Sequence, residues 1–185
     1  MTESIKTPGL LLQSIPYLGK KKILKILTPE QGLISLFAQT SSLTPFCIAE
    51  WVYRKSNQEI HSIQDTTLLD PLFELRTSYA ILSAAGSIAQ DLLRTQMPGK
   101  KAPFALASAY LKKLPLNPPI FAASFRLKLL LHEGLLSPDP DPMFSPLEWE
   151  QVSILGFSRQ FSQIGQVKDP PWKKIELLFE ERLSC

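Results

Sequence analysis

The periodicity of the sequence changes at Asp70-Pro71, and this change constrains the fold more than any other feature. Before it, short apolar runs rich in β-branched and aromatic residues alternate with polar turns, as strands do. After it, apolar residues recur at three- and four-residue spacing, which is typical of amphipathic helices. We therefore predict an α+β chain, with a barrel domain over residues 1–70 and an all-helical domain over residues 71–185.

The first part of the chain has the strands and turns of a small barrel. Thr28-Pro29-Glu30-Gln31-Gly32 places proline at the second position of a turn and glycine at its end, so residues 22–39 predict a hairpin. The polar residues 54–58 predict a second hairpin loop. So few short strands cannot bury a face as an open sheet, and we expect five of them to close into a barrel. The runs that supply them are residues 9–15, 22–27, 33–39, 46–53 and 59–69.

The second part predicts a bundle of helices. Its third helix is apolar on nearly every side, as expected for a helix at the centre of a bundle. Ser145-Pro146-Leu147-Glu148 is a capping box with proline at the first helical position, so it predicts a helix start. The expected helices cover residues 72–96, 103–114 and 118–136, and two more begin at Ser145 and Asp169.

The composition excludes several classes of protein. With 20 Lys and Arg against 17 Asp and Glu, the net charge is +3, so any nucleic-acid binding must come from local basic patches. The two cysteines argue against a disulfide framework and favour a reducing compartment. We expect Cys47 in the core and Cys185 in a solvated tail. No segment resembles a signal peptide or a membrane span, and we expect a cytoplasmic protein.

No motif of catalysis or metal binding occurs in the sequence. There is no Gly-rich phosphate loop, no G-x-S-x-G and no Cys/His cluster with metal-ligand spacing. The two histidines, His61 and His132, are far apart in sequence, and we expect His132 to have a structural role. The expectation is therefore a protein that is not an enzyme, has no catalytic residues, and uses no cofactor and no metal.

Two stretches, residues 28–46 and Phe125–Pro138, resemble the bacterial RecO family of recombination mediators. The first combines Thr28-Pro29-Glu30, Gly32–Leu36, Ala38 and Leu43–Phe46, which are similar to the N-terminal barrel of that family in order and in element. The second is Phe125–Pro138, which resembles the central helix of the family, where an F-x-x-x-L-L pattern runs into a glycine and a proline. The resemblance covers most of the chain up to about Pro138.

This resemblance implies an OB-fold barrel and a helical domain that bind single-stranded and double-stranded DNA. It also implies strand annealing, recombinase loading with a RecR-like partner, contact with the tail of the single-stranded-DNA-binding protein, and association with the nucleoid. On the central helix we assign partner binding to Phe125, Arg126 and Leu129.

The chain departs from the family at three places, and one of them is Ala123-Ser124, where the residues before the central phenylalanine are often basic in the family. Family members carry a basic loop where this chain has the uncharged Gln39-Thr40-Ser41-Ser42. Many members carry a four-cysteine zinc site where this chain has Asp139-Pro140-Asp141-Pro142-Met143. The remaining basic residues must then supply any DNA contact near the barrel, and the candidates are Lys20, Lys21, Lys22, Lys25, Arg54 and Lys55.

Several alternatives remain open at this point. The basic residues either contact phosphates or are ordinary solvated charges. Trp51 and Tyr53 share one strand face and either pack in the core or stack on bases. For the whole chain, the main hypothesis is a RecO-like DNA-repair mediator. The alternative is a non-catalytic protein-interaction adaptor that kept the scaffold but has little affinity for DNA.

Overall fold

The structure is a computed structural model that describes residues 4–184 of the chain. The residues form two compact units. The barrel unit contains the residues up to Leu75 together with Leu92–Ser108, and the helical unit contains Arg76–Asp91 together with the residues from Ala109 onward. The division into domains at Asp70-Pro71 stays a prediction.

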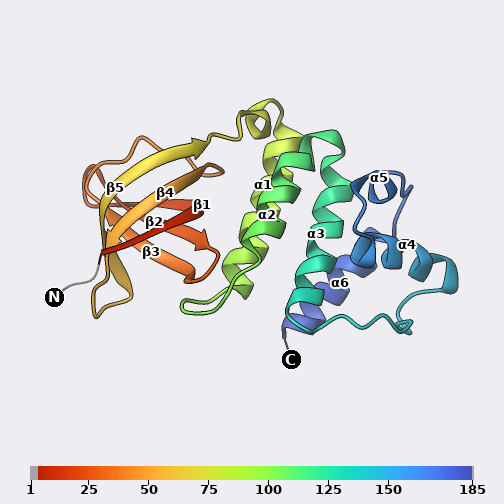
Figure 1. Cartoon of the computed structure of the whole chain (residues 1–185). Helices are drawn as coiled ribbons and strands as arrows, with labels where there is room; N and C mark the ends of the chain where they lie inside the picture. Colours follow the sequence, from red (N-terminus) through yellow and green to blue (C-terminus); the bar gives the residue numbers. More distant parts are fainter. Residues whose placement is uncertain (1–3, 185) are drawn as a thin grey trace. The chain divides into compact units, whose positions relative to one another are not determined.

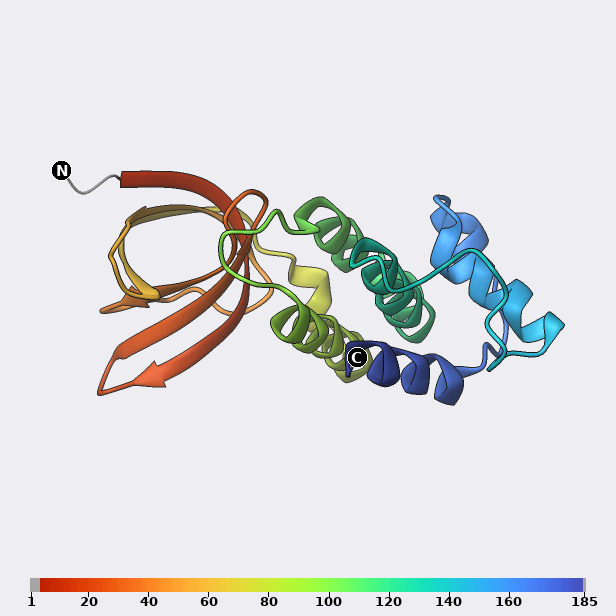
Figure 2. The same cartoon turned by 90° about the horizontal axis from the view of Figure 1, so that it is seen from below.

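The barrel unit contains the five predicted strands (Figure 1). They close into a barrel in the order β1-β2-β3-β5-β4, with β4 paired again to β1, which is the OB-fold order. All neighbours are antiparallel except β3 and β5, which pair in parallel over only three residue pairs. Viewed from below, the strands curve around the barrel (Figure 2). Their bounds are β1 Ser4–Tyr17, β2 Lys21–Thr28, β3 Gly32–Ala38, β4 Ile48–Arg54 and β5 Ile60–Asp70.

Alternate strand residues point inward and fill the barrel. Trp51 and Tyr53 are almost completely buried there, so core packing is the correct alternative for both residues. The Trp51 indole donates a hydrogen bond of 3.1 Å to the Gly9 carbonyl, which satisfies its only polar atom. Cys47 is buried in the same core, as predicted, whereas Cys185 lies outside the described residues. The other core residues are Leu11, Leu24, Ile26, Ile34, Leu36, Ala38 and Ala49.

The predicted β2–β3 hairpin exists, and a second segment of chain holds its turn. Gly32 forms an isolated antiparallel bridge with Pro98. The amide of Leu33 donates to the Met97 carbonyl at 3.3 Å, and the amide of Gly99 donates to the Gln31 carbonyl at 2.8 Å. A third bond of 3.0 Å joins the amide of Ala102 to the Pro29 carbonyl. Backbone hydrogen bonds to residues 97–102 therefore hold this turn within the barrel unit.

The helices follow the predicted order with three differences. The predicted helix over 72–96 is broken near Thr77-Ser78 into a 3₁₀ turn and α1. The predicted helix over 118–136 ends at His132, because Gly134 adopts a positive φ of 73° and the chain leaves the helix there. The short α5 and the 3₁₀ turn η2 were not predicted. The bounds are η1 Phe73–Arg76, α1 Tyr79–Thr95, α2 Phe104–Lys113, η2 Leu114–Leu116, α3 Pro118–His132, α4 Pro146–Phe157, α5 Phe161–Ile164 and α6 Trp172–Leu183.

Helix α3 is the centre of the helical unit, as its apolar sequence predicted. It contacts η2, α4, α5 and α6. The Tyr110 ring packs edge-on against Phe121, Phe125 and Phe161, and its hydroxyl lies 2.7 Å from the buried Ser124 hydroxyl. Burial raises the pKa of Tyr110 to about 12. No helix within residues 4–184 is both long and apolar enough to cross a membrane.

Candidate nucleic-acid interface

The strand β2 separates its side chains cleanly between the barrel core and the outer surface. Leu24 and Ile26 are completely buried in the core, whereas Lys21, Ile23 and Lys25 alternate with them and face outward. Residues directly opposite on paired strands share a face, so Ile23 lies between Ile15 of β1 and Phe37 of β3. The outer surface of β1, β2 and β3 therefore combines apolar, aromatic and basic side chains.

Phe37 is the aromatic centre of this surface, and Tyr17 is its neighbour. The two rings meet edge-on with centroids 6.2 Å apart, and the Lys21 ammonium lies 5.9 Å from the Phe37 centroid. Tyr17 is 46% exposed and Phe37 is half-buried, so both rings are accessible to a ligand. The sequence analysis missed both residues. The signal that could have found them is the alternation of β3, which places Phe37 on the opposite face from the core residue Leu36.

The four predicted lysines occupy three different environments. Lys20 and Lys21 are exposed at the β1–β2 turn. Lys25 is half-buried and donates a 2.8 Å hydrogen bond to the Ser35 hydroxyl across the sheet. Lys22 faces the other way and donates a 3.1 Å hydrogen bond to the Ser41 carbonyl, so it also holds the loop after β3. The structure thus brings Lys20, Lys21 and Lys25 to the outer surface and Lys22 to its edge.

Arg54 lies at the far end of the same cross-strand row, and Lys55 follows it in the chain. Arg54 is opposite Ser62, and Ser62 is opposite Phe37, so the row continues round the barrel from the aromatic centre to Arg54. Lys55 begins the β4–β5 loop next to His61. The His61 ring is stacked on Tyr53 with centroids 5.4 Å apart. Burial, and then the Lys55 charge, lower the pKa of His61.

The loop after β3 is bordered by three hollows in the barrel unit, all of which include Thr40. The lysine hollow, of about 500 Å³, is lined by Lys20, Lys22, Thr40, Ser41 and Ser42. The phenylalanine hollow, of about 360 Å³, is lined by Phe37, Gln39, Thr40, Ser62 and Ile63. The aspartate hollow, of about 350 Å³, is lined by Thr40, Ser41, Ser42, Leu43, Ile63, Gln64, Asp65, Thr66 and Leu68. A basic, an aromatic and an acidic environment therefore surround one uncharged loop.

The residues predicted to bind a partner lie on α3 inside the helical unit. Phe125 and Leu129 are completely buried and pack the core of that unit. Arg126 forms a two-pronged ion pair with Asp91, at 2.8 and 3.2 Å, and lies 5.0 Å from the centre of the Phe179 ring. The Asp91 side chain is only 5% exposed, so this ion pair is an internal contact of α1 with α3. Partner binding by these residues stays a prediction.

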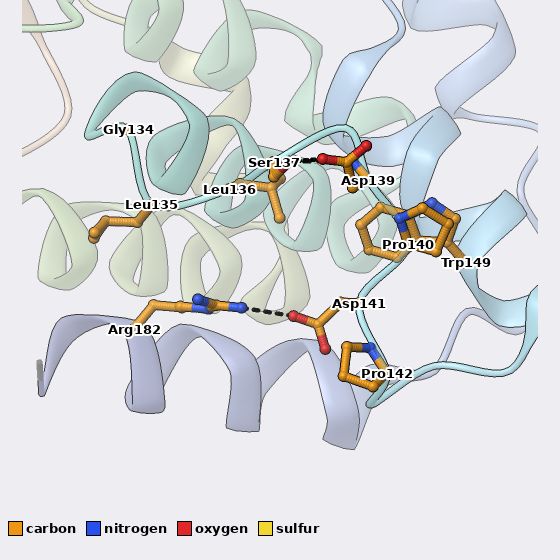
Figure 3. A pocket seen from close by; sticks show the side chains of 10 residues that line it. All are labelled: Gly134, Leu135, Leu136, Ser137, Asp139, Pro140, Asp141, Pro142, Trp149 and Arg182. Atoms are coloured by element: carbon orange, nitrogen blue, oxygen red, sulfur yellow. Dashed lines mark hydrogen bonds and ion pairs between the residues drawn. The ribbon is translucent and has the colours of Figure 1, made fainter.

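The helical unit has a cavity of its own, of about 520 Å³, between the segment after α3 and the end of α6 (Figure 3). Arg182 of α6 donates a 2.7 Å hydrogen bond to the Asp141 carboxylate in this cavity. Buried Leu136 and Trp149 are also part of its lining. Asp139 and Asp141 belong to the stretch in which the sequence resemblance implies cysteines for many family members. Within residues 4–184, no group of three His, Cys, Asp or Glu residues is arranged to hold a metal ion.

Comparison with known proteins gives consistent matches. Residues 1–72 match the family model for the N-terminal part of Recombination protein O. The chain is 32% identical to the DNA repair protein RecO of Chlamydia trachomatis serovar L2, over 71% of this chain and 59% of that protein. It is 30% identical to the RecO of Chlamydia pneumoniae, over 71% and 57%, and 26% identical to that of Anaeromyxobacter sp. strain K, over 72% and 58%. The chain therefore spans less than two thirds of the length of these relatives.

Proposed function

Because this chain is a divergent member of the RecO family, we propose that it is a DNA repair and recombination mediator that binds DNA without catalysing covalent chemistry. Its ligands are single-stranded and double-stranded DNA. Its partners are a RecR-like protein and the tail of the single-stranded-DNA-binding protein, with which it anneals strands and loads recombinase at the nucleoid. The relatives support the class of function, and the outer surface of the barrel is where we propose that the DNA binds.

The observation that carries the DNA-binding proposal is the outer surface around Phe37. Single-stranded DNA is held by positive charge along its backbone and by aromatic rings on which bases stack. Lys21 and Lys25 flank Phe37 on this surface, and Tyr17 adds a second exposed ring. A base that stacks on Phe37 displaces the Lys21 ammonium from the ring, and the ammonium is then free to contact the phosphate beside that base.

The test is the salt dependence of oligonucleotide binding. We expect the combined variant Lys20→Ala, Lys21→Ala and Lys22→Ala to bind single-stranded DNA several-fold more weakly at low salt than the unmodified chain. The slope of log affinity against log salt should flatten by up to roughly two units, because each phosphate contact on a single strand contributes about 0.7. Fluorescence anisotropy with a labelled oligonucleotide over a series of salt concentrations measures both quantities.

A matched variant separates local contacts from net charge. Arg159→Ala, Lys168→Ala and Lys173→Ala also removes three positive charges, all exposed and all in the helical unit. It should leave the slope close to that of the unmodified chain. If the lysine variant melts normally and keeps the same affinity and slope, the lysines are ordinary solvated charges. The protein-interaction adaptor is then the better hypothesis.

A further inference from the structure

The loop Gln39–Ser42 carries hydroxyl groups where DNA-binding loops usually carry charge, and its surroundings differ on each side. Among residues 4–184, the hydroxyls of Thr40 and Ser42 have no hydrogen-bond partner, and both residues are exposed. Ser41 fixes the loop instead, because its hydroxyl accepts a 3.3 Å hydrogen bond from the Leu43 amide and its carbonyl accepts one from Lys22. The hydrogen bonds of Ser41 therefore fix the loop, and the hydroxyls of Thr40 and Ser42 remain available to a ligand.

The lysine hollow has the chemistry of a phosphate site. Its lining contains two lysines and three hydroxyl residues and no carboxylate. An ammonium group has three donors, and Lys22 uses one of them on the Ser41 carbonyl, so two remain. Hydrogen bonds from charged donors to phosphate oxygens are among the strong ones. An anion in this hollow therefore meets ammonium and hydroxyl donors and no carboxylate.

The phenylalanine hollow, which shares only Thr40 with the lysine hollow, has the chemistry of a base site. Phe37 and Ile63 give it an aromatic and an aliphatic wall, and Gln39 and Ser62 add an amide and a hydroxyl that can bond the edge of a base. Asp65 in the third hollow disfavours a phosphate there, since like charges repel. The phosphate is therefore expected on the lysine side of the loop alone.

We propose that one nucleotide of a single strand sits astride Thr40, with its phosphate in the lysine hollow and its base in the phenylalanine hollow. This inference rests on the proposed function and assigns a subsite to it. The hydroxyls of Thr40 and Ser42 donate to the phosphate in place of a basic loop. Neutral donors release no counterions, so this part of the binding free energy does not depend on salt.

The experiment compares Thr40→Val combined with Ser42→Ala against the unmodified chain, using an oligothymidylate. We expect affinity to fall roughly a hundredfold, about tenfold for each hydrogen bond lost to a charged group, while the salt slope stays unchanged. The lysine variant is also expected to lose affinity, but its salt slope should flatten, so the slope distinguishes the two variants. Thr67→Val combined with Ser83→Ala removes two exposed hydroxyls outside the three hollows and should leave affinity unchanged.

A second comparison tests the base side. Phe37→Ala should weaken binding of the oligothymidylate more than binding of an abasic oligonucleotide of equal length, since only the former has bases to stack. Ser42→Asp, which places a carboxylate in the lysine hollow, should weaken both, and it tests the phosphate side independently if the double variant does not fold. If the unmodified chain binds DNA and the Thr40 and Ser42 variants bind equally well, the subsite is overturned and the proposed function stands. If the unmodified chain binds no DNA at any salt concentration, both are overturned.

Discussion

Gly32 occupies a position that only glycine can fill without strain. Its φ of +69° lies in the left-handed region, and a Cβ built there would come within 2.6 Å of the Lys100 carbonyl. The same close approach lets the segment around Pro98 bond to the turn. The glycine that closes the Thr28–Gly32 turn therefore forms the turn and also lets the segment around Pro98 lie against it.

We expect Gly32→Ala to lower the free energy of unfolding by more than the roughly 1–2 kcal/mol that a left-handed alanine costs alone. The additional loss arises because its methyl group collides with backbone atoms, which cannot rotate away. Gly19→Ala is the matched control, since Gly19 has a φ of +70° but no atom within 4 Å of a built Cβ. Urea unfolding followed by circular dichroism measures both. Equal losses in the two variants would contradict the clash.

Residue patterns predicted some of the candidate site and missed its aromatic part. The exposure of Lys20 and Lys21 was predictable because adjacent charges at a short turn must reach solvent, whereas Lys22 is half-buried and donates to the Ser41 carbonyl. The burial of Trp51 and the outward orientation of Phe37 were not predictable, because alternation alone does not say which face of a strand points into the core. Trp51 is buried since its strand β4 faces the core at odd positions, and Phe37 faces out since Leu36 faces in. That choice depends on how the strands pair.

At the scale of the element, the start of α4 is a complete capping box. The Ser145 hydroxyl accepts from the Glu148 amide, and the Glu148 carboxylate accepts from the Ser145 amide at 2.8 Å and from Lys174 at 2.6 Å. The hydrogen bond from Lys174, and then the one from Ser145, lower the pKa of Glu148 to about 2. The helix start was predictable from S-P-L-E, whereas the contribution of Lys174 from α6 depends on the tertiary fold.

This capping box predicts a dependence of stability on pH. The folded chain keeps the Glu148 carboxylate ionised at pH values below its ordinary pKa of 4.5. The stability that this carboxylate contributes is therefore fully present above pH 4.5 and is lost as the pH falls toward about 2. We expect Glu148→Gln to be less stable than the unmodified chain at pH 7, and the difference should shrink across this range. Thermal melts between pH 7 and pH 2 measure it. Glu176→Gln, on the exposed face of α6, is the control, and a difference that does not change with pH would contradict the argument.

At the scale of the whole molecule, the order of barrel and helices was predictable, but the composition of the barrel unit was not. The change of period at Asp70-Pro71 marks where strands give way to helices. The barrel unit nevertheless includes Leu92–Ser108. Leu27 and Leu33 face away from the barrel core and are nevertheless buried. Residues outside the barrel core must therefore cover these two side chains. Sequence periodicity predicts local structure, and it does not show that Leu92–Ser108 packs with the barrel after Arg76–Asp91 has left it.

The barrel unit should therefore depend on residues that lie beyond the strands. We expect a fragment of residues 1–75 to melt at a lower temperature than a fragment of residues 1–108, or to fail to fold. The shorter fragment lacks the backbone hydrogen bonds that Met97, Gly99 and Ala102 make to the β2–β3 turn. Circular dichroism at matched concentrations compares the two. Equal melting temperatures would show that residues 1–75 suffice and would support a domain boundary near Asp70-Pro71.

The parallel pairing of β3 with β5 is the shortest junction in the barrel, and it has a mechanical consequence. A closed ring opens first where fewest hydrogen bonds must break, so local opening is expected between Ser35–Phe37 and Ile60–Ser62. The phenylalanine hollow takes its walls from both sides of this junction, with Phe37 on one strand and Ser62 on the other. A ligand bound in this hollow would contact β3 and β5 at the same time. A ligand that binds only the closed barrel then stabilises the β3–β5 pairing, and a stable β3–β5 pairing in turn favours binding of that ligand.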